Sequence, residues 1–252
     1  MSTVIKAEKL GRSFSEKGRE SSVLSGISFS VEAGEFVSIM GPSGSGKSTL
    51  LYCVSGMDTP SEGRVEFCGS DIASFNDDEL SRVRRTRMGF IFQQPSLLKN
   101  LSVLDNIMLV AAREDKKDLP NIKKRALELM KNAGIEELAD RSISSLSGGQ
   151  LQRAGVCRAL MCEPEILFGD EPTGALNSSS AREIMQIFQH INAEGTAILL
   201  VTHDAKIAAQ SERVIFMRDG SIADELMLGK YRGELLEERT VQVNGSMQML
   251  GI

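Results

Sequence analysis

The chain has 252 residues, of which 41% are hydrophobic and 25% are charged, enough apolar sequence to bury a full core. Its net charge of -5 and isoelectric point near 5.3 argue against a nucleic-acid partner, whose binding surface would be basic. No apolar run approaches the ~20 residues of a membrane-spanning helix. The first residues lack the apolar stretch of a secretion signal, so we expect the chain to stay in the cytoplasm.

The first part of the chain alternates apolar and polar residues, a pattern typical of half-exposed antiparallel strands. Ile27, Phe29 and Val31 alternate with serine and glutamate, and residues 65–67 repeat the pattern. Phe14 falls in this region, and we place it in a loop between strands. Because an aromatic residue in a β-rich segment is commonly part of the core, the pattern alone leaves the role of Phe14 open.

Residues 41–48 read Gly-Pro-Ser-Gly-Ser-Gly-Lys-Ser and follow an apolar run, residues 36–40, that predicts a buried strand. A strand, this loop and a helix together form the context in which the G-x-x-x-x-G-K-[ST] motif binds phosphate. The glycines let backbone N–H groups turn toward an anion, and the helix dipole adds to this attraction. Lys47 can reach the β- and γ-phosphates, and the Ser48 hydroxyl can take one position on Mg²⁺. The expected nucleotide-binding residues here are Gly41, Ser43, Gly44, Ser45, Gly46, Lys47, Ser48 and Thr49.

Two further polar groups follow apolar runs that predict strands. Asp170 and Glu171 come after residues 166–169, and His203 comes after residues 196–201. Taken alone, such residues are most often strand ends, loop residues or a buried histidine. The phosphate loop upstream instead favours a shared site, in which Asp170 contacts Mg²⁺ and Glu171 polarises a water for attack on the γ-phosphorus.

The pattern becomes helical from about Pro95 to Leu146 and predicts a helical lobe. The following segment, Ser147-Gly148-Gly149-Gln150, opens another helix with Ser147 as its N-cap. Its two glycines expose backbone N–H groups, which would suit a second phosphate site.

The last part of the chain contains a hairpin and an unassigned tail. Residues 213–217 and 221–225 flank Asp219-Gly220, a strong hairpin turn. Residues 226–252 mix charge, glycine and methionine without a clear period, and we assign them no structure.

One basic cluster stands out in an otherwise acidic chain. It consists of Arg82, Arg84, Arg85 and Arg87. We interpret these arginines as a solvated helix face or, alternatively, as a contact for an acidic partner loop or for anionic lipid headgroups.

Together these motifs resemble the ATP-binding cassette family. Leu-Ser-Gly-Gly-Gln at 146–150 is specific to that family among phosphate-loop proteins, and the resemblance runs from about residue 3 to 225. It implies an α/β fold with a phosphate-loop (RecA-like) core, an antiparallel β subdomain and an inserted helical subdomain. We therefore expect a single nucleotide-binding domain over 1–252, with the core and β subdomain in 1–94 and 147–225, the helical subdomain in 95–146 and a tail in 226–252.

The resemblance also implies roles for single residues. His203 would contact the γ-phosphate and orient the attacking water, and Gln93 would report the γ-phosphate and Mg²⁺ to the helical lobe. Phe14 would stack on adenine, where the family usually has tyrosine. The expected catalytic residues are Glu171, His203 and Lys47, and the expected Mg²⁺ contacts are Ser48, Gln93 and Asp170. The residues expected to serve the ATP of a second copy, in a head-to-tail dimer, are Ser147, Gly148, Gly149 and Gln150.

Residues 93–107 look like those of cassettes that serve lipoprotein-release, macrolide-efflux and bacitracin-type antimicrobial-peptide permeases, and residues 171–177 look most like the last type. The expected function is the ATP-hydrolysing subunit of a bacterial transporter, held at the cytoplasmic face of the membrane by an integral permease, for antimicrobial-peptide resistance or export. The alternatives are lipoprotein release, macrolide efflux and a peptide-antibiotic sensing complex that signals to a kinase. A DNA-repair or translation cassette would need a coiled-coil insertion or a second cassette, which this sequence does not show.

Two residues depart from the family pattern. Asn177 stands where most cassettes have aspartate, a residue that touches the opposing phosphate loop across the dimer. Gly169 stands where a bulkier apolar residue is often found. Because asparagine lacks the carboxylate, Asn177 leaves open how tightly the two nucleotide sites of the dimer are coupled.

Overall fold

The computed structural model describes residues 2–16, 19–115 and 117–252. Its elements, in chain order, are β1 (Thr3–Glu16), β2 (Arg19–Glu32), β3 (Phe36–Met40), α1 (Lys47–Val54), β4 (Glu62–Phe67), β5 (Ser70–Asp71), α2 (Asp77–Thr86), β6 (Met88–Phe92), α3 (Val103–Glu114), α4 (Leu119–Asn132), α5 (Gly148–Leu160), β7 (Ile166–Asp170), α6 (Ser178–Ala193), β8 (Ala197–Val201), α7 (Ala205–Ala208), β9 (Arg213–Arg218), β10 (Ser221–Met227) and α8 (Leu236–Leu250). Among the described residues, no helix is both long enough and apolar enough to cross a bilayer.

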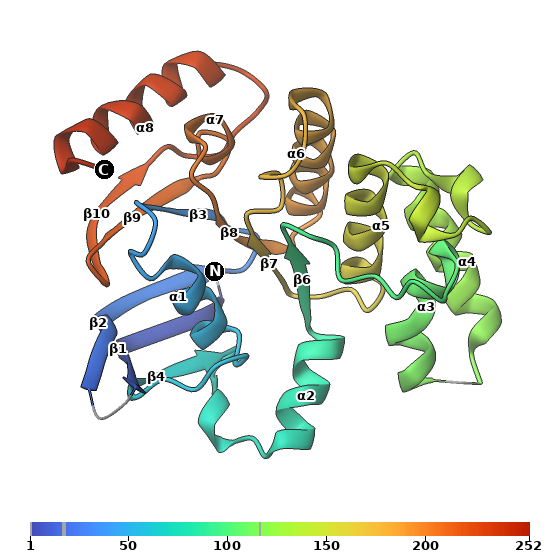
Figure 1. Cartoon of the computed structure of the whole chain (residues 1–252), viewed down its shortest axis with the longest axis horizontal. Helices are drawn as coiled ribbons and strands as arrows, with labels where there is room; N and C mark the ends of the chain where they lie inside the picture. The colour runs from blue at the N-terminus through green and yellow to red at the C-terminus, as the bar shows by residue number, and fades with distance from the viewer. Residues whose placement is uncertain (1, 17–18, 116) are drawn as a thin grey trace.

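A six-stranded sheet in the order β10-β9-β3-β8-β7-β6 forms the centre of the molecule, with all neighbours parallel except β10. Strands β3 and β8 are apolar except for Ser38 and are wholly buried, as strands covered on both faces must be. Helix α1 and the second sheet cover one face, while α5 and α6 cover the other (Figure 1). Because parallel strands end at the same edge, the loops after β3, β7 and β8 meet there.

The second sheet is antiparallel, in the order β2-β1-β4-β5, and confirms the alternating pattern of the N-terminal part. The predicted loop position of Phe14 is wrong. Phe14 lies within β1, opposite Ser21 of β2, because the two strands stay paired beyond the point where the apolar alternation stops. Its side chain is 43% exposed, and the Arg12 guanidinium lies 4.4 Å from the ring centroid.

The helices predicted between residues 95 and 146 are present as α3 and α4, and they pack with α5 around an apolar core of their own (Figure 1). Val103, Ile107 and Met130 are fully buried in it. Asn106 is also fully buried, where its side-chain amide accepts a hydrogen bond from the Leu98 N–H (2.7 Å) and donates one to the Leu98 carbonyl (3.0 Å). The segment that follows Gln93 is therefore fixed to α3.

The tail, to which the sequence analysis assigned no structure, contains helix α8. Val243 is buried against α7 and the β9–β10 hairpin, but polar residues and Gly245 weaken the helical period of the sequence. Arg239 anchors the helix, because its guanidinium donates hydrogen bonds to four backbone carbonyls. These carbonyls belong to Ala209, Ser211, Leu228 and Gly229.

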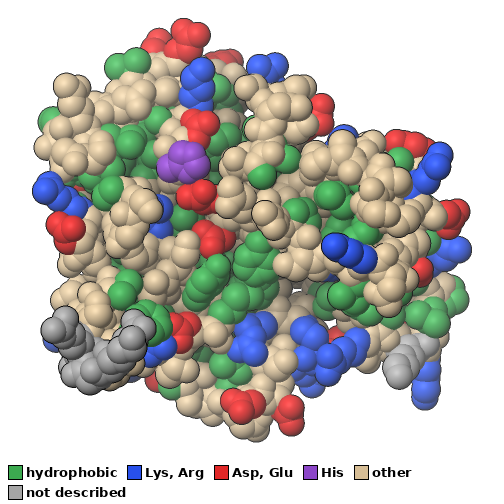
Figure 2. All heavy atoms as spheres, in the orientation of Figure 1, with side chains coloured by type: hydrophobic (Ala, Val, Ile, Leu, Met, Phe, Trp, Pro, Cys, Tyr) green, Lys and Arg blue, Asp and Glu red, His purple; other side chains and the backbone are tan. Residues whose placement is uncertain are grey.

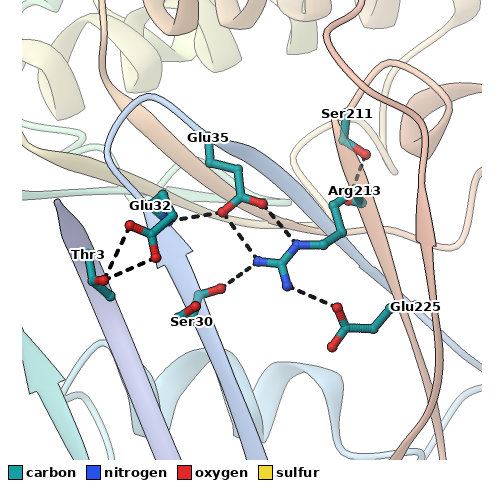
Figure 3. Close-up of polar contacts among 7 residues, drawn as sticks. All are labelled: Thr3, Ser30, Glu32, Glu35, Ser211, Arg213 and Glu225. Atoms are coloured by element: carbon teal, nitrogen blue, oxygen red, sulfur yellow. Dashed lines mark hydrogen bonds and ion pairs between the residues drawn. The ribbon is translucent and has the colours of Figure 1, made fainter. Parts of the chain in front are cut away.

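A network around Arg213 joins the two sheets at the edge opposite the loops after β3, β7 and β8 (Figure 3). The Arg213 guanidinium contacts both carboxylate oxygens of Glu35, at 2.9 and 3.2 Å, and one oxygen of Glu225 at 2.9 Å. It also donates to the Ser30 carbonyl in β2. The side chains of Arg213 and Glu35 are only 11% and 14% exposed, so this bidentate pair is largely shielded from water.

The basic cluster is mostly engaged within the chain. Arg85 lies 2.8 Å from Glu114 of α3, Arg84 donates to the Gly56 carbonyl, and Arg87 pairs with Glu165 at 2.7 Å. Arg82 lies 3.7 Å from Glu114 but remains 75% exposed. The interpretation as a solvated helix face therefore fits Arg82, whereas the other three arginines hold α2 to its neighbours.

Candidate functional site

The loop between β3 and α1 has the backbone that a phosphate loop requires. Gly46 has φ of 94° and caps α1, and a side chain there would meet Leu24 Cδ2 at 2.8 Å and the Val23 carbonyl at 2.9 Å. Gly41 is as crowded, since a Cβ atom would lie 2.8 Å from Ser45 Oγ. Only glycine fits at these positions, because both the conformation and the space exclude a side chain.

Lys47 lies over this loop. Its ammonium group donates to the Gly41 carbonyl at 2.9 Å and to the Pro42 carbonyl at 2.8 Å, and the residue is 8% exposed. Burial lowers the pKa of Lys47, while Glu171 and Asp170 act in the opposite direction. The ammonium group is thus held at the loop, where a phosphate oxygen could replace its carbonyl acceptors.

Asp170, at the end of β7, accepts two hydrogen bonds from α1. The Ser48 hydroxyl donates to Oδ1 at 2.9 Å, and the Tyr52 hydroxyl donates to Oδ2 at 2.8 Å. Tyr52 is not among the residues expected from the sequence motifs; its position four residues after Ser48 places both hydroxyls on one helix face. Burial and the bond to Asp170 raise the pKa of Tyr52 to about 12, so the phenol remains a donor at neutral pH.

Glu171 follows Asp170 in a left-handed conformation, with φ of 48°. Such a backbone is strained for a residue other than glycine, and strain of this kind tends to occur at functional sites. Glu171 Oε1 lies 3.3 Å from Nδ1 of His203, which follows β8. The side chains of Glu171 and His203 are 29% and 65% exposed, so both are open to solvent.

These residues share one cavity of about 510 Å³. It is lined by Val23, Gly41, Ser43, Gly44, Gly46, Lys47, Ser48, Thr49, Glu171 and His203. Val23 is a further residue that the sequence analysis missed, because nothing in its local pattern distinguishes it from any other strand residue. Ser45 is a buried residue of the loop, and its hydroxyl has no hydrogen-bond partner among the described residues.

Gln93, just after β6, reaches the same region. A side chain on Gly174 would lie 3.0 Å from Gln93 Nε2 and 3.4 Å from Glu171 Oε2, so Gly174 leaves room for both side chains to converge. Phe14 does not line the cavity, and neither does any residue of Ser147–Gln150. The structure thus brings most of the predicted site residues together and places the 147–150 segment elsewhere.

The segment 147–150 begins α5 as predicted. Ser147 Oγ accepts the Gln150 N–H, and the Gln150 side chain accepts the Ser147 N–H, which is a complete capping box. Gly149 packs against Ser180 in the first turn of α6. Asn177 caps that same turn, since its side chain accepts the Ser180 N–H at 2.9 Å.

The oxygen ligands near the loop fit Mg²⁺. Among the residues that the structure describes, no group of three or more His, Cys, Asp or Glu side chains could hold a metal alone. Mg²⁺ usually takes only one or two protein oxygens and completes its shell with phosphates and water. Because the Ser48 O–H donates to Asp170, the lone pairs of Ser48 Oγ remain available for such an ion.

Comparison with known proteins agrees with this site. The sequence profile described as "ABC transporter" matches residues 24–174. The chain is 43% identical over 216 residues to the macrolide export ATP-binding/permease protein MacB of Campylobacter jejuni, covering 86% of this chain but 34% of that protein, so it spans about a third of that relative. It is 40% identical to the lipoprotein-releasing system ATP-binding protein LolD of Aquifex aeolicus, over 90% of this chain and 99% of that one.

A solved structure of the ATP-binding cassette MJ0796, a dimer in a post-hydrolysis state bound to ADP and Pi, matches with a TM-score of 0.84. The match has 36% sequence identity and covers 90% of this chain and 100% of that one. The resemblance drawn from the sequence motifs and the predicted fold class are confirmed. The chain therefore belongs to the ABC transporter family, among the ATPase cassettes that include macrolide-export and lipoprotein-release proteins.

Proposed function

We propose that this chain hydrolyses ATP at the cavity formed by the loops after β3, β7 and β8. The observation that carries the proposal is the convergence of Lys47, Asp170, Glu171 and His203 on one phosphate loop. Lys47 and the loop N–H groups bind the phosphates, and Glu171 polarises the attacking water. His203 lies 3.3 Å from Glu171 and orients the same water.

Ser48 and Asp170, with Gln93 beside them, would hold Mg²⁺. The ion, when bound, would supply positive charge that offsets the negative charge developing on the phosphate groups in the transition state. Phe14 remains our proposal for the adenine contact. Its ring is 43% exposed on β1, and the Arg12 guanidinium over it, which pairs with Asp58, adds a second flat group for a base to contact.

We further propose that two copies assemble head to tail, each supplying residues 147–150 to the ATP of the other. Ser147 and Gly148 are exposed at the start of α5 and lie outside the cavity of their own chain. The N-terminus of a 13-residue helix attracts anions. The similar cassette MJ0796 has been solved as a dimer, which supports this arrangement.

A membrane permease is the proposed second partner. A groove of about 270 Å³ between α2, β6, α3 and α5 combines apolar and basic groups, and Figure 2 shows basic side chains beside an apolar surface in the region of α2 and β6. Met57, Phe90, Phe92 and Val110 are among its apolar residues. An amphipathic segment of a permease fits such a surface. We propose that the helical segment 95–146 moves with this partner and that the complex lies at the cytoplasmic face of the membrane.

The substrate hypotheses remain antimicrobial peptides first, with macrolide efflux, lipoprotein release and peptide-antibiotic sensing as alternatives. The two relatives described above are named for macrolide export and lipoprotein release, so their names support these two alternatives and add nothing to the antimicrobial-peptide hypothesis. A DNA-repair or translation cassette is the least supported alternative.

Phosphate release by the purified chain, and by its complex with the permease, tests the proposal. Glu171→Gln should lower the hydrolysis rate by at least ~10²-fold while ATP binding persists, because the amide cannot act as a general base. Glu194→Gln is a matched control, since Glu194 forms the other Glu–His pair at 3.3 Å, on the exposed face of α6. Hydrolysis by Glu171→Gln at the parental rate would remove Glu171 from this role.

A further inference from the structure

Among the residues that the structure describes, Tyr52 is the one residue outside the phosphate-loop motif whose side chain donates a hydrogen bond to the Asp170 carboxylate. It lies on α1 one turn after Ser48, so the two hydroxyls occupy the two oxygens of the Asp170 carboxylate. From this arrangement we infer that Tyr52 is a positioning residue that holds Asp170 for Mg²⁺ binding. The inference rests on the proposed function of the site.

The hydroxyl geometry explains why both bonds are needed. A serine hydroxyl has one hydrogen to donate and two lone pairs to offer. When the Ser48 O–H is donated to Asp170 Oδ1, its lone pairs remain available to an ion. That orientation requires the carboxylate to stay in one rotamer, and the Tyr52 bond at 2.8 Å fixes the other oxygen. Without it, Oδ2 would lose its only described side-chain donor, and the carboxylate would be free to turn.

The Tyr52 side chain is itself held firmly. Its ring packs against the core between α1 and the sheets. Its backbone carbonyl accepts three hydrogen bonds, from the Met57 N–H (2.9 Å), the Asp58 N–H (3.0 Å) and the Ser55 hydroxyl (3.2 Å). Phenol and carboxylate therefore meet between two rigid elements, α1 and the end of β7, which suits a positioning role.

Tyr52→Phe removes one oxygen atom and keeps the ring. ATP binding is measured by calorimetry in EDTA and again with Mg²⁺. We expect the affinity in EDTA to be unchanged and the affinity with Mg²⁺ to fall about tenfold, the size of one hydrogen bond to a charged group. Tyr231→Phe is the matched control, because Tyr231 is the only other tyrosine of the chain and lies beside Arg239. It should change neither affinity.

A second comparison separates positioning from packing. In an Asp170→Asn chain, adding Tyr52→Phe should cause no further loss of Mg²⁺-dependent binding, because the charged acceptor is already gone. An equal loss of affinity with and without Mg²⁺, or the same loss in the Asp170→Asn background, would overturn the positioning role. Failure of the parental chain to bind ATP even with Mg²⁺ would instead contradict the proposed function itself, and the inference about Tyr52 with it.

Discussion

Gly149 at the start of α5 lies directly against Ser180 in the first turn of α6. A Cβ atom added at Gly149 would be 2.6 Å from Ser180 Oγ and 3.0 Å from Ser180 Cβ. The segment 147–150 is thus seated on the helix that Asn177 caps. The segment 147–150, which we propose to face the opposing nucleotide, is thus joined through one serine to the turn at Asn177, which the family resemblance places against the opposing phosphate loop.

This contact predicts that dimerisation depends on the size of the side chains at positions 149 and 180. Gly149→Ala should displace the start of α5 and weaken the ATP-dependent dimer of the Glu171→Gln chain, since overpacking of this kind costs ~1–3 kcal/mol. Adding Ser180→Gly removes both clashing atoms and should restore dimerisation, measured by analytical ultracentrifugation. Ser180→Ala, which leaves Cβ in place, should restore it only in part. If neither change restores the dimer, the steric explanation is wrong.

Asn177 provides a second prediction. Asn177→Asp keeps the hydrogen bond to the Ser180 N–H and adds a negative charge at the N-terminus of α6, so the chain should gain ~0.3–1 kcal/mol of stability in thermal unfolding. If Asn177 also touches the opposing site, the hydrolysis rate or its cooperativity in ATP should change more than ATP affinity does. Unchanged hydrolysis kinetics across an ATP titration of the assembled transporter would show that asparagine in place of aspartate at position 177 has no effect on hydrolysis.

The network around Arg213 predicts a large loss of stability away from the nucleotide site. Arg213→Met would leave Glu35 largely buried and without its bidentate partner, and breaking such a pair costs about 3 kcal/mol or more. The measurement is the urea midpoint of the purified chain. Lys6→Met, which breaks the exposed pair of Lys6 with Glu8, serves as the control and should leave the midpoint nearly unchanged. Equal shifts of the urea midpoint for the two substitutions would contradict the predicted contribution of Arg213 to stability.

The groove proposed for the permease predicts a loss of coupling without a loss of nucleotide binding. Met57 lines the groove and is 42% exposed, so Met57→Asp should not disturb the core. Copurification with the permease should fall strongly, because a desolvated carboxylate would face an apolar contact. Met249→Asp, at an 83% exposed position on α8, is the control and should leave copurification intact. If the Met57→Asp chain copurifies with the permease at the parental level, the permease binds a surface other than this groove.

The parts of the site that were predictable from the sequence are those whose chemistry is local. The strand, loop and helix around residues 36–54 follow from an apolar run and from glycines with enforced backbone conformations, and the capping box of Ser147 and Gln150 follows from four consecutive residues. The apolar run before Asp170 likewise predicts a carboxylate at the end of a buried strand, which is where β7 ends.

Other features depend on contacts between distant segments and could not be predicted in this way. Tyr52 looks like an ordinary helix residue until β7 brings Asp170 within 2.8 Å of it. The sequence pattern does not predict helix α8, because the helix is held by Arg239 and a narrow buried stripe and has no strong apolar period. The sequence pattern does not show that Phe14 lies in a strand, because β1 and β2 remain paired beyond the segment in which apolar and polar residues alternate.

The most direct test of the account concerns the shared site of two copies. A Glu171→Gln chain with Mg²⁺ and saturating ATP should form a dimer in size-exclusion chromatography with light scattering, and the dimer should dissociate when ATP is removed. Adding Ser147→Arg should abolish this dimer, because it places bulk and positive charge against the opposing phosphate site, whereas Ser144→Arg, an exposed position just before α5, should not. A Glu171→Gln chain that stays monomeric with saturating Mg-ATP, both alone and with its permease, would contradict the head-to-tail arrangement.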